Sequence, residues 1–246
     1  MKQIPYGRQS ISKKDLNEVV KSLSNDLITT GPYVKKFENL IKKTLKTKFA
    51  LTCTSGTAAL HLAFMSINLK KEDVIILPII NFIAASNLGS MLQAKIYYAD
   101  VCPNTGQMTP ETLEACVKKN KLKNIKAVVT MYLGGNPDNI KNFYNLKRKY
   151  KFYLLEDACH ALGSKYIYNG KIYNVGSCFH SDICIFSLHP LKTITSGEGG
   201  IITTNNLDIF NKLLKLKNNG IDRKDYKKKV NFPHWLYDIK YPGLNY

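Results

Sequence analysis

Two residues in the second half of this sequence have side chains that a single cofactor requires together. Asp157 follows the apolar run at residues 152–156, and Lys192 lies in the loop after the apolar run at residues 183–187. A lysine amine can form a Schiff base with an aldehyde, and a carboxylate beside a ring nitrogen keeps that nitrogen protonated, so that the ring acts as an electron sink. Pyridoxal phosphate depends on both groups. The pair predicts pyridoxal-phosphate chemistry, while a helix cap or an ion pair remains an alternative role for Asp157.

A phosphate site is predicted where Ser55, Gly56 and Thr57 follow an apolar run and open an amphipathic segment. Free N–H groups at a helix N-terminus, together with hydroxyl groups, bind phosphate, and a glycine lets the phosphate approach the backbone. An ordinary helix N-cap is the alternative, because serine and threonine are favoured there. Ser187 is a candidate second phosphate ligand, or else a strand-end hydroxyl bonded to the backbone.

Two ring-bearing residues could contact the cofactor. Phe82 could stack on a flat ring, although a core aromatic would explain it as well. His160, three residues after Asp157, could support the same ring, or it could be a packed and hydrogen-bonded histidine. The sequence contains no metal-ligand motif, so we expect no metal.

Apolar runs of strand length alternate with amphipathic segments of helix length. We predict strands at residues 49–54, 74–77, 95–99, 127–132, 153–156, 183–187 and 200–204. We predict helices at residues 13–24, 34–45, 57–67, 83–92, 110–119, 139–150 and 206–219. This alternation is typical of an α/β fold with a mostly parallel seven-stranded sheet covered by helices on both faces. Ligands of such sheets bind beyond the carboxyl ends of the strands, where Ser55, Asp157 and Ser187 fall.

The composition narrows the class of protein further. The 246 residues, 44% of them hydrophobic, suit one large domain, or one domain with part of another. Apolar runs are too short for a membrane span, and the six cysteines are scattered, which predicts a cytoplasmic protein with reduced thiols. The net charge of +18 comes from 33 lysines and only 3 arginines spread along the chain. We therefore expect no nucleic-acid partner; a nucleic-acid-binding protein is an alternative that rests on charge alone.

Taken in order, these motifs resemble the DegT/DnrJ/EryC1/StrS family of pyridoxal-phosphate sugar aminotransferases. The matching segments are Ile4-Pro5-Tyr6-Gly7-Arg8, residues 29–38, Ser55-Gly56-Thr57, Phe82, Glu156-Asp157-Ala158-Cys159-His160-Ala161 and residues 187–200, which read SLHPLKTITSGEGG. Leu188 replaces the usual phenylalanine, and Cys159 stands where a small residue is common. Within the family, the chain is most similar to the PseC branch, and this likeness is carried by the start of the chain and by residues 233–235 and 241–246. Members of that branch aminate C4 of a UDP-linked 4-keto-6-deoxy sugar on the way to pseudaminic acid.

The resemblance implies a type I fold and roles for particular residues. Lys192 would hold the cofactor and move a proton, and Asp157 would keep the ring nitrogen protonated. Phe82 would fix the ring plane, with Ser55, Gly56, Thr57 and Ser187 on the phosphate. Asn245 would reach the cofactor phosphate of the neighbouring subunit in a homodimer. The residues implied on the substrate side are Tyr6, Asp26, Leu27, Ile28 and Thr29.

The resemblance also implies the substrates and the domain layout. The amino donor would be L-glutamate and the acceptor a UDP-linked keto sugar. Residues 1–30 would form the N-terminal segment of the substrate entrance and residues 31–246 the cofactor-binding major domain. We expect the small C-terminal domain of the family to be absent, which makes a non-catalytic remnant one alternative. A related nucleotide-sugar dehydratase is another, but in that branch a histidine replaces the lysine, so Lys192 argues against it.

Overall fold

The computed structural model describes residues 4–222 and 235–246; the predicted likeness at Pro233 and His234 lies outside these residues. The helices are α1 (Lys13–Leu23), α2 (Pro32–Leu45), α3 (Gly56–Ser66), α4 (Ala84–Met91), α5 (Pro110–Lys119), α6 (Ile140–Tyr150) and α7 (Leu207–Leu216), with the 3₁₀ turn η1 (Leu133–Gly135). The strands are β1 (Phe49–Cys53), β2 (Val74–Pro78), β3 (Lys95–Ala99), β4 (Ile125–Met131), β5 (Tyr153–Asp157), β6 (Lys165–Tyr168), β7 (Lys171–Asn174), β8 (Ile183–Ser187), β9 (Gly200–Thr204), β10 (Ile221–Asp222) and β11 (Asp238–Ile239).

Seven strands form one sheet in the order β1-β9-β8-β5-β4-β2-β3. Strand β9 is antiparallel to both of its neighbours, and the other pairs are parallel. All strands except β9 therefore run in one direction, and their carboxyl ends meet at one edge of the sheet. The α/β fold with a mostly parallel seven-stranded sheet, expected from the sequence, is confirmed.

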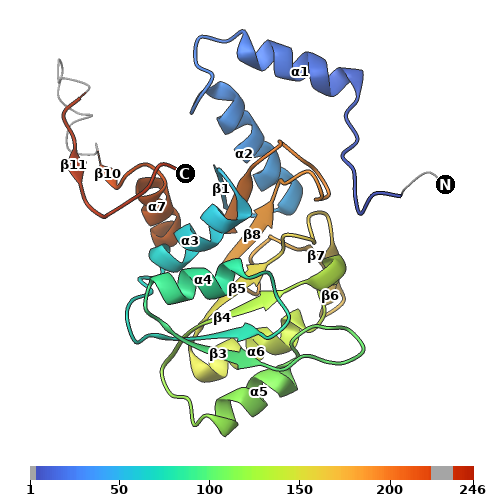
Figure 1. Ribbon diagram of the computed structural model, residues 1–246, viewed down its shortest axis with the longest axis vertical. Helices are drawn as coiled ribbons and strands as arrows, with labels where there is room; N and C mark the ends of the chain where they lie inside the picture. The colour runs from blue at the N-terminus through green and yellow to red at the C-terminus, as the bar shows by residue number, and fades with distance from the viewer. Residues whose placement is uncertain (1–3, 223–234) are drawn as a thin grey trace.

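Apolar side chains on both faces of the sheet explain why helices cover it on both sides (Figure 1). Helices α3, α4 and α7 cover one face, where Ile75 and Leu77 of β2 are buried. The intervening Ile76 is buried on the other face, against α5 and α6. Successive strand residues point to opposite faces, so a strand that is apolar throughout is buried on both faces. Burial on both faces holds β5 and β8 in place, and these strands end at Asp157 and Ser187.

Two segments differ from the sequence-based expectation. Strands β6 and β7 form a separate hairpin that we did not predict. Near the end of the chain, where we predicted no strand, β11 pairs with β10 and Asn245 bridges to Asn218. These pairings are short, so they leave little trace in the hydrophobic pattern.

Helix α1 lies apart from the sheet (Figure 1), and none of its residues is buried. Its start is set by a capping box, in which the Ser12 hydroxyl accepts the N–H of Asp15 and the Asp15 carboxylate accepts the N–H of Ser12. Among the described residues, no helix combines the length and apolar character needed to cross a membrane.

Candidate active site

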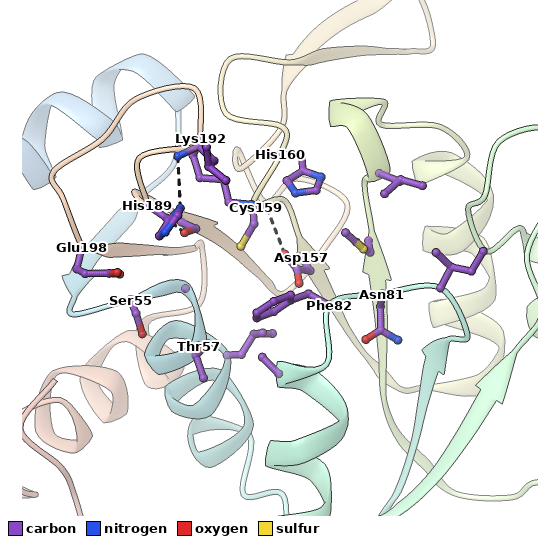
Figure 2. Close-up of a pocket in the computed structure, with 18 of the residues that line it drawn as sticks. Ser55, Thr57, Asn81, Phe82, Asp157, Cys159, His160, His189, Lys192 and Glu198 are labelled. Carbon is purple, nitrogen blue, oxygen red and sulfur yellow. Dashed lines mark hydrogen bonds between the residues drawn. The ribbon is translucent and has the colours of Figure 1, made fainter. Parts of the chain in front are cut away.

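A cavity of about 620 Å³ opens at the carboxyl ends of the parallel strands. Its lining includes nine of the residues predicted from the sequence: Tyr6, Ser55, Gly56, Thr57, Phe82, Asp157, His160, Ser187 and Lys192. Figure 2 shows Ser55 and Thr57 at the N-terminal end of α3, Asp157 at the end of β5, and Cys159 and His160 just beyond it. The fold thus brings together residues that are up to 186 positions apart in the sequence.

The N-terminus of α3 lies where the sequence predicts a phosphate site, and we call Ser55, Gly56 and Thr57 the phosphate cup. The Ser55 hydroxyl accepts the N–H of Ala58 at 3.0 Å, so it acts as the helix N-cap. The first N–H groups of a helix have no partner inside it, which leaves those of Gly56 and Thr57 available to an anion. A methyl group at Gly56 would lie 3.0 Å from Ser187 Cβ, so a side chain would crowd this cup.

Asp157 is the last residue of β5 and is 5% exposed. Its Oδ1 accepts the N–H of Cys159 at 3.2 Å. Its backbone carbonyl accepts the N–H of Tyr132 at 3.1 Å, which fixes the strand end. A buried carboxylate is costly unless a cation or hydrogen-bond donors face it. The protonated nitrogen of a bound ring would provide such a cation.

Lys192 is held in a loop that closes on itself between β8 and β9. The Leu188 N–H donates to the Gly199 carbonyl at 2.8 Å, and the Thr195 hydroxyl donates to the Leu188 carbonyl at 2.9 Å. The Lys192 N–H donates to the His189 carbonyl at 2.9 Å (Figure 2). These bonds direct a half-buried lysine into the cavity from the end of β8.

The remaining predicted residues complete the walls. Phe82 is 64% exposed, so its ring is open to stack on a ligand. Burial and then the positive charge of Lys192 lower the pKa of His160, against the opposing charge of Asp157. A neutral imidazole therefore faces the cavity at neutral pH.

Five of the predicted residues lie in the described part of the chain but do not line this cavity. They are Asp26, Leu27, Ile28, Thr29 and Asn245. Residues 26–29 are exposed in the turn between α1 and α2, and Asn245 is exposed beside α7. Their predicted roles in substrate binding and in a neighbouring subunit remain predictions.

The structure also adds residues that the sequence argument did not place in the site. They are Asn81, Cys159, His189 and Glu198, together with the apolar Leu60, Ile80, Ala84, Met131, Leu133 and Leu191. Cys159, His189 and Glu198 belong to the same sequence motifs as Asp157 and Lys192. Their place in these motifs could have predicted that they line the site. The Asn81 side chain donates to the Pro78 carbonyl and shapes the turn that presents Phe82.

A mostly parallel sheet with a helix N-terminus, a buried carboxylate and a lysine at one edge has the architecture of the aminotransferases of the type I fold. The chain belongs to the DegT/DnrJ/EryC1/StrS aminotransferase family, whose family model matches residues 9–246. This match confirms the expected family, and pyridoxal phosphate is the cofactor of this aminotransferase family.

Individual relatives agree with this assignment. The UDP-4-amino-4,6-dideoxy-N-acetyl-beta-L-altrosamine transaminase of Campylobacter jejuni subsp. jejuni (serotype O:23/36) is 36% identical over 99% of this chain and 60% of its own length. Helicobacter pylori PseC, an aminotransferase in pseudaminic acid biosynthesis, has a similar fold, with a TM-score of 0.85, 24% identity, and coverage of 100% of this chain and 62% of that chain. The PLP form of a sugar aminotransferase from Streptococcus pneumoniae gives a TM-score of 0.82 at 24% identity, over 98% and 62%. The chain thus spans about three fifths of the length of these relatives.

Proposed function

We propose that this chain is the cofactor-binding part of an aminotransferase that moves an amino group from L-glutamate to C4 of a UDP-linked 4-keto-6-deoxy sugar. The observation that carries the proposal is the convergence of Lys192, buried Asp157 and the phosphate cup on one cavity. The name of the Campylobacter jejuni relative supports the choice of sugar. The presence of lysine at position 192 favours amination over the dehydratase alternative.

The residues of the cavity fit pyridoxal phosphate. The N–H groups of Gly56 and Thr57 and the hydroxyl of Ser187 would bind the phosphate, and the carboxylate of Asp157 would accept the ring N–H. The exposed ring of Phe82 would cover one face of the cofactor ring. When bound, the cofactor supplies an aldehyde for the amino group and a ring that stores electrons.

Lys192 has two tasks in this proposal. Its amine would hold the cofactor covalently, and the free amine would move the proton at the substrate carbon as base and acid. His160 is neutral because burial and Lys192 lower its pKa. It therefore adds no second positive charge beside the amine that must take up the proton.

We also propose that two copies of the chain associate. Three apolar residues in and beside the segment that carries the cavity residues Ile80 and Phe82 are well exposed, namely Ile79, Ile80 and Ile83 at 53%, 49% and 58%. A second copy would cover them and would bring its Asn245 toward the phosphate cup. Residues 26–29 and Tyr6 would then line the entrance for the sugar. Sedimentation equilibrium of the cofactor-loaded protein tests the association.

The substrate is tested in a single-turnover experiment. The protein is loaded with pyridoxamine phosphate and mixed with a UDP-linked 4-keto-6-deoxy sugar, a GDP-linked one, or pyruvate. We expect the UDP sugar to restore the pyridoxal absorbance and to yield an amino sugar by mass spectrometry, and Lys192→Ala to do neither. Faster reaction with the GDP sugar would overturn the nucleotide assignment. No reaction with any acceptor would overturn the proposed function of this chain.

A further inference from the structure

Cys159 lies between Asp157 and the phosphate cup in the candidate site. It follows Asp157 by two residues and lines the cavity (Figure 2). Its backbone N–H donates to Asp157 Oδ1 at 3.2 Å. Its Sγ atom would lie 3.3 Å from a methyl group placed at Gly56, so the sulfur reaches the phosphate cup. Cys159 therefore lies between the Asp157 carboxylate, which its backbone contacts, and the N-terminus of α3, which its side chain reaches.

The thiol of Cys159 remains protonated in this environment. Burial, then the negative charge of Asp157 and the hydrogen bond to its carboxylate, raise the pKa of the thiol far above the ordinary value, and the charge of Lys192 opposes them only in part. The sulfur is thus protonated across the physiological pH range. A protonated, buried thiol is a poor nucleophile, which leaves donation to Asp157 as its chemical role.

We propose that Cys159 is a positioning residue for Asp157, holding the carboxylate through its N–H and S–H groups while its sulfur packs against Gly56 of the phosphate cup. The inference rests on the proposed function, in which Asp157 accepts the ring N–H of the cofactor. A thiol is a weak donor. It orients the carboxylate yet takes up little of its negative charge, which remains available to the ring nitrogen.

This role predicts different effects for two substitutions at one position. Cys159→Ala retains the backbone N–H but loses the S–H donor and the contact with Gly56. Cys159→Ser restores a donor, and the hydroxyl is stronger than the thiol, so it should stabilise the charged carboxylate more. A residue that only fills space would give similar results with alanine and serine, because both are smaller than cysteine.

A first test uses the protein without cofactor. The rate of Cys159 alkylation by iodoacetamide is measured against pH by peptide mass spectrometry, in the wild type and in Asp157→Asn. Removing the carboxylate charge should move the alkylation profile of Cys159 to lower pH. The profile of the half-buried Cys102, which lies outside the cavity, should not move. Fully buried Cys184 should stay unmodified, which shows that the variant is folded. An unchanged Cys159 profile would overturn the contact between thiol and carboxylate.

A second test uses the cofactor-loaded protein and L-glutamate. We expect Cys159→Ala to slow the half-reaction by about tenfold, which corresponds to one hydrogen bond to a charged group, with little change in the glutamate concentration at half-maximal rate. Cys159→Ser should recover most of the rate and shift its pH profile, and the control Cys102→Ala should match the wild type. Equal rates and pH profiles in the wild type and both Cys159 variants would overturn the positioning role. If the wild type itself does not react, the proposed function fails, while the alkylation test still decides the contact.

Discussion

Gly200 of β9 lies directly against the backbone of Ser55 at the phosphate cup. A methyl group at Gly200 would be 2.2 Å from the Ser55 carbonyl oxygen and 2.6 Å from its carbonyl carbon. Both atoms belong to the backbone, so no side-chain rotation relieves the contact. Gly200 also pairs with Ser187 of β8, the second predicted phosphate ligand. Glycine at this position therefore sets how closely the N-terminus of α3 approaches β9, beside Ser187 of β8.

Gly200→Ala should destabilise the protein and weaken cofactor binding. Overpacking of this kind costs about 2 kcal/mol, and the relief that requires least movement shifts Ser55 away from β9. Urea unfolding measures the stability, and fluorescence titration measures the affinity for pyridoxal phosphate. The matched control is Gly199→Ala, because its methyl group would meet the Ser196 hydroxyl, a side chain that can rotate. Equal effects of both substitutions would contradict the special role of Gly200.

Lys192 should be the residue that binds the cofactor covalently. Borohydride reduction of the loaded protein, followed by peptide mass spectrometry, should place the pyridoxyl group on Lys192. Lys192→Ala should lower the rate with glutamate by about a hundredfold or more, because the proton carrier is lost. Lys171→Ala, on the exposed strand β7, is the control and should retain full labelling. A label on a different lysine would refute the assignment.

Asp157→Ala should slow the reaction with glutamate without the loss of stability that a purely structural role would cause. Without the carboxylate, the ring nitrogen of the bound cofactor loses the partner that keeps it protonated. The glutamate half-reaction should then slow by about a hundredfold or more, with a smaller change in cofactor affinity. If Asp157 only caps the turn at residues 157–159, the variant should instead lose about 1 kcal/mol of stability and keep its rate. Stopped-flow absorbance and urea unfolding of the same samples distinguish these outcomes.

The strands of the main sheet were predictable because burial makes most of their residues apolar, on both faces in central strands such as β5 and β8. The predicted strand at residues 183–187 coincides with β8, and the one at 153–156 ends one residue before β5 does. The order of the strands was not predictable, since it depends on contacts between distant segments. In particular, nothing in residues 200–204 indicates that β9 runs antiparallel between β1 and β8.

The hairpin β6–β7 could have been predicted from its turn sequence, although its strands do not stand out in the hydrophobic pattern. Asn169 and Gly170 form its turn with φ values of 48° and 73°, and Asn-Gly is the preferred pair for such a turn. The flanking strands are rich in tyrosine and partly exposed, so they lack a continuous apolar run. In the site, the motifs predicted Asp157 and Lys192, whereas the contact of Cys159 with Gly56 required the fold.

Glu156, next to Asp157 in β5, points to the opposite face of the sheet and is 3% exposed. The Tyr132 hydroxyl donates to its Oε1 at 2.8 Å. Burial raises the pKa of the Glu156 carboxyl above its ordinary value of 4.5, although hydrogen bonds from Tyr132, Ser181 and Cys184 oppose this shift. The folded state therefore favours the protonated carboxyl.

Glu156→Gln should change the pH dependence of stability in a defined direction. Above pH 4.5 the unfolded chain releases the Glu156 proton while the folded protein retains it, so wild-type stability falls as the pH rises from 4.5 toward the raised pKa. Glutamine mimics the protonated carboxyl, and its amide can donate to the neighbouring Ser181 hydroxyl. The free energy of unfolding of the variant, relative to the wild type, should thus increase with pH over this window.

Glu114→Gln is the control of opposite sign. Hydrogen bonds from Lys149 and Tyr150 lower the pKa of Glu114, so this variant should lose stability relative to the wild type as the pH rises through 4.5. Urea unfolding between pH 4 and pH 8 measures both series, and parallel curves for wild type and Glu156→Gln would show that Glu156 does not retain its proton in the folded state.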